Sequence, residues 1–329
     1  MKPRHAGLLG VRLLLALVIA AVATASSGVT NEPAIGAKPI HMIVATVPGV
    51  PPDVVARILA ERLEPLLHQP VIVENRPGAI GSIGLAAVSH AAPDGSTLGV
   101  IAMPYVVAPS LIHVPYDLER DFTPVTLVTH AYAMLAVRSD SPVRTVADLI
   151  ARARARPGAV TFASTGNGTP SHLAASLLQR ETGTRMLHIP YKGNAAVAGL
   201  LGGDVDFMMT SPFALWPHVK AGKLRVLATT APKRLDAYPD VPTLAELGYP
   251  DVQITDWQGI LAPPGTPPEI VAKLRNALVT VLSMSDVRQK LETMGLEAAT
   301  SEPDEFARLI ASEIRRWNAV VRDTGMKAD

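Results

Sequence analysis

What this sequence lacks excludes several classes of protein. It contains no cysteine, which removes disulfide frameworks, thiolate nucleophiles, cysteine-ligated zinc and cysteine lipid anchors. Only 4% of its 329 residues are aromatic, and 30 lysines and arginines are balanced by 29 aspartates and glutamates. Neither base stacking nor phosphate neutralisation is favoured, so we expect no nucleic-acid partner. With 48% hydrophobic residues the chain can bury a large core, and its length suggests roughly two domains.

No apolar run is long enough to cross a membrane as a helix. Residues 13–23 form an 11-residue apolar run, whereas a spanning helix needs about 20 residues. Three basic residues precede or open the run, and Ala23-Thr24-Ala25 ends it as a small-residue cleavage site. This arrangement is typical of a secretory signal peptide. We therefore expect cleavage after Ala25 and an exported, slightly acidic mature chain.

Short apolar runs alternate with helical patterns along the rest of the chain, which is typical of α/β architecture. The expected strands are residues 40–46, 71–73, 98–102, 134–137, 160–163, 187–189, 205–209 and 224–228. A capping box from Thr145 to Asp148 opens one helix, and Asp53 stands where a helix N-cap belongs. The pattern changes after Thr123-Pro124 and again near Asp256-Trp257, which indicates two units.

Several expected strands end in glycine- or proline-rich loops directly ahead of helix N-termini. Such loops offer backbone N–H groups and the positive end of a helix dipole to an anion. Because ligands of open α/β sheets bind at the carboxyl ends of strands, residues 48–53, 78–82 and 164–172 are candidates. A carboxylate between them would bridge the two units. Each loop could equally be an ordinary connection in which glycine only permits a tight turn.

The sequence contains no strong catalytic or metal-binding motif. It has no G-x-S-x-G and no H-E-x-x-H, and its nine histidines are scattered, so we expect no catalytic centre, metal or cofactor. His172 could act as a general base and Asp53 could bind an ammonium group. A structural role for His172 and an N-cap role for Asp53 are the simpler interpretations. An exported hydrolase or isomerase that uses His172 and Asp53 is therefore an alternative.

A series of short motifs adds a family resemblance over nearly the whole mature chain. The motifs are Pro48-Gly49 with Asp53, Val73-Glu74-Asn75-Arg76-Pro77-Gly78-Ala79, Asp94-Gly95, Ser164-Thr165-Gly166-Asn167-Gly168-Thr169, Pro190-Tyr191-Lys192-Gly193 and Trp257-Gln258-Gly259. In this order and spacing they resemble the extracytoplasmic solute-binding proteins of tripartite tricarboxylate transporters, the Bug family.

The resemblance implies a two-domain α/β fold of the periplasmic-binding-protein type, in which two mostly parallel sheets flanked by helices are hinged about a ligand cleft. Domain I would comprise residues 39–130 and 255–329 and domain II residues 131–254, after a signal peptide (1–25) and a flexible lead (26–38). The resemblance also implies a monomeric periplasmic protein that delivers a small carboxylate to a membrane permease. A ligand sensor that docks to a histidine-kinase ectodomain is the other alternative.

The same resemblance implies four ligand loops. Their candidate residues are Pro48, Gly49, Val50, Pro51 and Asp53; Gly78, Ile80 and Gly81; Thr165, Gly166, Gly168, Thr169 and His172; and Tyr191 and Gly193. Three positions depart from the family pattern: Val50 and Ile80 replace glycine, and Gly199 stands where aspartate is frequent. Because branched side chains narrow a cleft, we expect a smaller or more apolar ligand than citrate.

Overall fold

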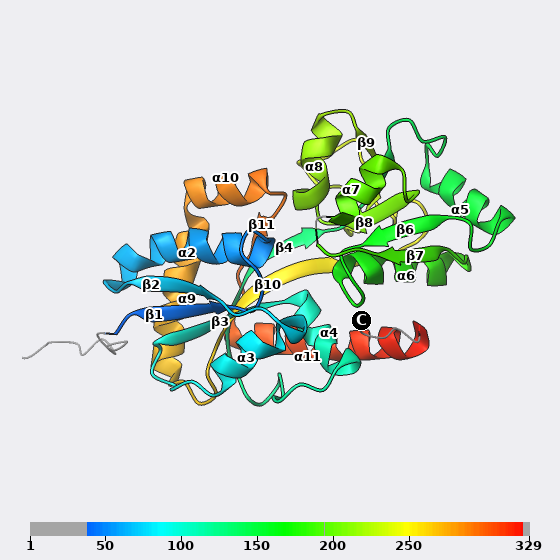
Figure 1. The fold of residues 1–329 in the computed structure, drawn as a ribbon. Helices are drawn as coiled ribbons and strands as arrows, with labels where there is room; N and C mark the ends of the chain where they lie inside the picture. Colours follow the sequence, from blue (N-terminus) through cyan, green and yellow to red (C-terminus); the bar gives the residue numbers. More distant parts are fainter. Residues whose placement is uncertain (1–37, 194, 325–329) are drawn as a thin grey trace, which may run out of the picture. The chain divides into compact units, whose positions relative to one another are not determined.

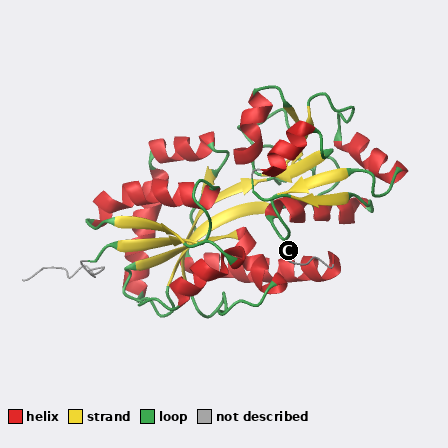
Figure 2. Cartoon of the chain, in the orientation of Figure 1, coloured by secondary structure: helices red, strands yellow, loops and turns green. Residues whose placement is uncertain are grey.

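The computed structural model describes residues 38–193 and 195–324, which form two β-sheets flanked by helices (Figures 1 and 2). The first sheet has the order β11 (Glu297–Ala298), β4 (Thr123–Tyr132), β10 (Thr255–Ala262), β3 (Thr97–Ala102), β1 (Ile40–Val44) and β2 (Val71–Asn75). The second has the order β7 (Leu187–Pro190), β6 (Thr161–Ser164), β8 (Phe207–Thr210), β5 (Met134–Arg138) and β9 (Leu224–Thr229). The expected signal peptide lies outside the described residues.

Both sheets combine parallel and antiparallel strands. In the first sheet β1 is parallel to β2 and β3, whereas β10 is antiparallel to β3 and β4. In the second, β6 is parallel to β7 and β8, whereas β5 is antiparallel to β8 and β9. The α/β fold with two sheets is confirmed. Most strands of each sheet nevertheless share one direction, as expected: β1 to β4 in the first sheet and β6 to β9 in the second, with β10 and β11 in the first and β5 in the second running against them.

Helices cover both faces of each sheet. On the first sheet, one face packs against α2 (Pro51–Leu67), α9 (Pro268–Ser283) and α10 (Ser285–Thr293), and the other against α3 (Ser82–Ser89), α4 (Met103–Leu111) and α11 (Pro303–Thr324). Successive residues of β1 alternate between these two cores, with Met42 in one and Ile43 in the other. Burial on both faces explains why the central strands are nearly continuous apolar runs.

The second sheet is covered in the same way. Helices α5 (Val146–Ala155) and α6 (Pro170–Thr182) contribute to the core on one face, and α7 (Ala195–Gly202) and α8 (Pro212–Lys220) to the core on the other. The expected capping box is confirmed: the Asp148 amide donates to the Thr145 hydroxyl, and the Asp148 carboxylate accepts from the Thr145 amide. It satisfies two amides at the start of α5.

The chain passes between the sheets at two adjacent points. Only Ala133 separates β4 from β5, and the return runs from the end of β9 to the start of β10. Buried Thr230 connects both passages: its hydroxyl accepts from the Ala133 amide at 2.9 Å and donates to the Ile254 carbonyl at 2.8 Å. Its own amide donates to the Ala133 carbonyl at 2.9 Å. Thr230 therefore ties together the segments that join the two sheets.

We expect Thr230→Val to lower the free energy of unfolding by about 2 kcal/mol, because it leaves a buried N–H and a buried C=O without their partner. The neighbouring Thr229 is a matched control, since it is equally buried and its hydroxyl has no partner within the described part of the chain. Thr229→Val should change stability by less than about 0.5 kcal/mol. Urea unfolding of the two variants measures the difference. Equal losses of stability would show that the hydrogen bonds of Thr230 do not stabilise the passages between the sheets.

Candidate functional site

The first candidate loop follows β1 and opens α2. Gly49 has φ +83°, a left-handed conformation that glycine adopts without strain, and an added Cβ would meet no atom within 4 Å. Helix α2 begins at Pro51 with Val50 as its N-cap, so the expected N-cap role of Asp53 is wrong. The two prolines at the helix start lack N–H groups that would otherwise be left without partners.

Asp53 holds this loop in place through hydrogen bonds. Its side chain is buried, and its carboxylate accepts hydrogen bonds from the Gly49 amide at 2.9 Å, from Asn75 Nδ2 at 2.9 Å and from Arg57 Nε at 3.1 Å. Arg57 also forms an ion pair with it across one helical turn. Burial acts to raise the pKa of Asp53, but the bonds from Arg57, Gly49 and Asn75 together hold the pKa below its ordinary value. Asp53 is thus an ionised residue that fixes the loop.

The second candidate loop is the short 3₁₀ turn η1 (Ala79–Gly81) between β2 and α3. All four residues from Gly78 to Gly81 have positive φ, including +46° at Ala79 and +50° at Ile80. A β-branched residue in this region is strained, at a cost of about 1 to 3 kcal/mol. Ile80 thus occupies a backbone conformation suited to glycine, the residue that the family resemblance implies there.

We expect Ile80→Gly to be better tolerated than Ile72→Gly, because only the first relieves a left-handed conformation. Ile72 is 43% exposed and lies in the extended strand β2, so glycine there gains no relief. The free energies of unfolding in urea should differ by about 1–2 kcal/mol in favour of Ile80→Gly. Equal losses of stability in the two variants would mean that the backbone of Ile80 is not strained.

The third candidate loop connects β6 to α6. Gly166 and Gly168 have φ +134° and +72°, and the Ser171 hydroxyl accepts from the Thr165 amide at 3.0 Å. The Gly166 amide donates to Ser164 Oγ at 3.2 Å, and the Thr169 hydroxyl donates to the Gly166 carbonyl at 2.7 Å. Small hydroxyl side chains therefore define the shape of this loop from within.

His172 supports the same loop from the first turn of α6. Its ring stacks on His188 with centroids 3.8 Å apart, and its Nδ1 accepts from the Gly168 amide at 3.3 Å. Burial, and next the nearby His188, lower the pKa of His172 to about 3, so the imidazole stays neutral and acts as an acceptor. In the described residues His172 and Asp53 share no contact, and each is held by other partners. The geometry therefore does not form the acid–base pair that the enzyme alternative needs.

The fourth candidate loop follows β7 and lies beside the third. The Tyr191 amide donates to the Ser164 carbonyl at 3.0 Å, and a Cβ added to Gly166 would lie 4.0 Å from the Tyr191 carbonyl. A Cβ added to Gly199 of α7 would lie only 2.5 Å from the Tyr191 hydroxyl. The absence of a side chain at 199 therefore lets the Tyr191 ring lie against α7.

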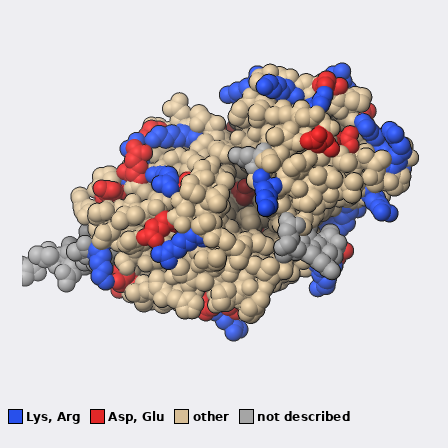
Figure 3. All heavy atoms as spheres, in the orientation of Figure 1, with Lys and Arg blue, Asp and Glu red and all other residues tan. Residues whose placement is uncertain are grey.

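Helix α4 contacts loops from both sheets. A Cβ added to Gly81 would lie 2.5 Å from the Tyr105 ring, and one added to Gly168 would lie 2.3 Å from Leu111. Tyr105 and Leu111 are at opposite ends of α4. Because both loops contact this one short helix, the second and third loops lie in one region. Figure 3 shows a hollow in the surface between the parts built on the two sheets.

Only some of the candidate glycines leave their backbone donors unbonded. The amides of Gly49, Gly81, Gly166 and Gly168 already donate to protein acceptors, so these glycines shape the loops. Within the described residues no acceptor is found for other amides of the same loops, including those of Val50, Gly78, Ala79, Ile80, Lys192 and Gly193. The amides without a protein acceptor thus belong both to candidate glycines and to their neighbours.

Sequence reasoning missed the residues that lie beneath these loops. Tyr105 of α4 packs on Gly81, and its pKa is raised by burial and then by the charge of Asp256, with a hydrogen bond to Thr46 acting against this. Asp256 is the second residue of β10, a strand that the sequence pattern did not reveal. The available signal was an acidic residue directly before a buried apolar run.

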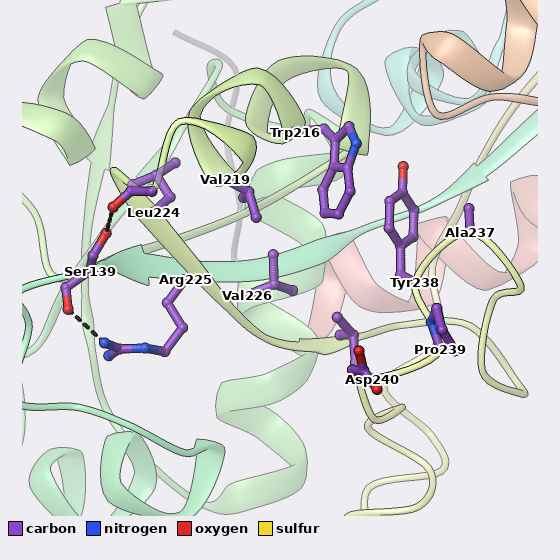
Figure 4. Close-up of a pocket in the computed structure, with 12 residues that line it drawn as sticks. Ser139, Trp216, Val219, Leu224, Arg225, Val226, Ala237, Tyr238, Pro239 and Asp240 are labelled. Atoms are coloured by element: carbon purple, nitrogen blue, oxygen red, sulfur yellow. Dashed lines mark hydrogen bonds between the residues drawn. The ribbon is translucent and has the colours of Figure 1, made fainter.

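A separate cavity of about 510 Å³ lies on the second sheet, beside β9 and α8 (Figure 4). Trp216 and Tyr238 line it, with ring centroids 4.2 Å apart. Arg225 points toward Ser139, whose carbonyl accepts from the guanidinium at 2.6 Å (Figure 4). The cavity contains none of the sequence-predicted site residues.

Residues 38–193 and 195–324 lack two further features. Neither segment contains a helix with the length and apolarity needed to span a membrane. Nor do they bring together three histidine, aspartate or glutamate side chains in an arrangement suited to a metal ion.

Two helix-flanked sheets joined by adjacent crossing strands, with helix-opening loops from both sheets in one region, define a two-domain solute-binding protein of the periplasmic type. The family model for the tripartite tricarboxylate transporter family receptor, TctC, matches residues 55–326, and the chain belongs to this family. Protein BugT of Bordetella pertussis is 38% identical over 319 residues, which are 95% of this chain and 98% of BugT.

Solved structures agree with this family membership. MatC from Rhodopseudomonas palustris, solved with bound malate, is 33% identical with a TM-score of 0.75, over 86% of this chain and 99% of that one. A second R. palustris protein, solved with adipate, is 32% identical with a TM-score of 0.79, over 88% of this chain and 98% of that one. The resemblance inferred from short motifs is therefore confirmed.

Proposed function

We propose that this chain captures a small carboxylate in the periplasm and delivers it to a membrane permease of the tripartite tricarboxylate type. The observation that carries the proposal is the set of unpaired backbone amides on the loops of both sheets, which includes those of Val50, Gly78, Ala79, Ile80, Lys192 and Gly193. Family membership and the malate and adipate bound to two relatives support it.

Backbone amides are sufficient for useful affinity. Micromolar binding requires about 8 kcal/mol. Charge-assisted hydrogen bonds contribute roughly 1.5–3 kcal/mol each before the cost of ordering the loops is subtracted. Four or five such donors meet the requirement without an arginine clamp, and Arg57 is already bound to Asp53 and Asn75.

Binding would act through closure of two domains about the crossing strands. Residues 39–130 and 255–329 would form domain I and residues 131–254 domain II, with Thr230 at the passages between them. To move the closed population from 1% to 99%, the ligand must favour the closed state by about 5.5 kcal/mol. The permease would then recognise the closed form.

The remaining parts of the proposal concern processing and chemistry. The leader would be cleaved after Ala25, as its basic start, apolar run and small residues suggest, and the mature protein would act as a periplasmic monomer. No catalytic step is proposed, since Asp53 and His172 have loop-supporting partners.

Calorimetric titration of the mature protein with a panel of carboxylates tests the proposal, alongside mass spectrometry of small molecules retained through gentle purification. We expect one or a few carboxylates to bind and to be recovered unchanged by NMR after incubation. A ligand that is consumed would support the enzyme alternative. Absence of binding by every carboxylate would contradict the proposal.

A further inference from the structure

Asp256 lies at the ligand-binding edge of the first sheet. Strand β10 is antiparallel to β3, and Gln258 pairs with Ala102, the last residue of β3. Asp256 lies two residues before Gln258 in this antiparallel strand and so extends beyond the carboxyl end of β3, on the same side as the loops that follow β1 and β2. On its other side it pairs with Ala131, directly before the passage to the second sheet.

Its surroundings are those of the candidate site. The charge of Asp256 acts on Tyr105, whose ring packs on Gly81 of the second loop and whose hydroxyl is hydrogen-bonded to Thr46 after β1. The carboxylate is thus close to the two ligand loops of the first sheet. It is enclosed by protein, although the residue as a whole is only half-buried.

In the part of the chain that the structure describes, Asp256 has no partner of opposite charge. Among the described residues no hydrogen bond or ion pair to its carboxylate is formed, and burial alone raises its pKa to about 6. Arg57 is bound to Asp53 and Asn75, and Lys192 on the fourth loop is exposed and forms no ion pair with it. At neutral pH an enclosed, mostly ionised carboxylate therefore faces the site without compensation, which favours a cation beside it and opposes another anion.

We propose that Asp256 selects carboxylate ligands that also carry a cationic nitrogen, and disfavours those that carry a second carboxylate. This inference rests on the proposed function, since the unpaired loop amides hold the ligand carboxylate while Asp256 binds the cationic end. The proposed function gives the chemical class of the ligand, and this inference adds which charges the ligand carries. The site would then be complementary to a zwitterion.

Matched ligands of equal length test the inference by calorimetry at pH 7.5. Each set contains a dicarboxylate, the amino acid with an ammonium group at the far end, and the corresponding alkanoate, with backbones of three to six carbons. We expect the best zwitterion to bind at least about tenfold more tightly than the dicarboxylate of the same length. Equal or tighter binding of the dicarboxylate would overturn the inference without any variant.

Asp256→Asn, which keeps the shape of the side chain, should reduce that preference about tenfold, because the zwitterion loses its anionic partner and the dicarboxylate loses a repulsion. Asp251→Asn is the matched control, because Asp251 is exposed and lies five residues earlier. An unchanged ligand ranking in Asp256→Asn would overturn the inference. If no member of any set binds the wild-type protein, the proposed function itself fails, and this inference with it.

Discussion

Gly49→Val is expected to weaken ligand binding by at least about 100-fold, which corresponds to about 2.7 kcal/mol. At φ +83° valine is strained, although the added side chain meets no atom within 4 Å. The loop will therefore relax toward negative φ, which moves the neighbouring Val50 amide and breaks the bond from Gly49 to Asp53. Calorimetry with any bound carboxylate measures the loss.

Gly158→Val separates loss of the site from backbone strain. Gly158 has φ +81°, also has no atom within 4 Å of an added Cβ, and lies in the turn after α5, outside the four ligand loops. Both variants should lose similar stability in urea, and only Gly49→Val should lose affinity. Similar affinities in the two variants would place the first loop outside the site.

Asp53→Asn is expected to lower stability by about 3 kcal/mol and affinity by about tenfold. An amide can accept only at its oxygen, so the bonds from Gly49, Arg57 and Asn75 cannot all be kept. The loss of affinity follows because the first loop is no longer fixed to the start of α2. Urea unfolding and calorimetry at pH 7.5 measure the two effects.

The acid dependence of stability provides a second measurement on the same variant. Because the folded pKa of Asp53 lies below the unfolded value of about 3.8, its contribution is complete above pH 4 and is lost as the pH falls through the folded pKa. The difference in stability between wild type and Asp53→Asn should therefore shrink as the pH is lowered below 4. A difference that is constant with pH would contradict an ionised Asp53.

Asp148→Asn is the matched control for Asp53→Asn. Asp148 occupies the same third position of a helix, α5, and also has a pKa lowered by hydrogen bonds, first of all from the Arg144 amide. It lies outside the ligand loops, so Asp148→Asn should change stability but leave affinity unaltered. A loss of affinity in this variant would mean that helix-start aspartates act on binding only through global stability.

The sequence revealed the strands that alternate regularly with helices and missed those that cross between the sheets. All eight expected strands are present within a few residues of their expected bounds. Strand β4 begins with Thr123-Pro124, which suggested a boundary. Buried β10 contains Asp256 and Gln258, which hide its apolar pattern. In β10 Gly259 is needed because an added Cβ would lie 2.0 Å from Phe306, a contact far away in sequence.

The sequence predicted which loops form the candidate site, but not which hydrogen bonds the amides of those loops make. Glycine- and proline-rich turns before helices are local features, so all four loops could be located from the chain alone. Whether a given amide is free depends on residues that only the fold brings close, such as Asn75 beside Asp53 and Ser164 beside the Tyr191 amide. The roles of Asp53, His172 and Asp256 could therefore not be derived from sequence.

A crystal structure of the mature protein with its retained or calorimetrically identified ligand tests the central claim most directly. We predict a carboxylate whose oxygens accept hydrogen bonds from backbone amides of loops on both sheets, including those of Val50 or Ile80 and of Lys192. A ligand lodged in the Trp216 cavity on the second sheet, or one whose carboxylate is neutralised chiefly by arginine and lysine side chains, would contradict it.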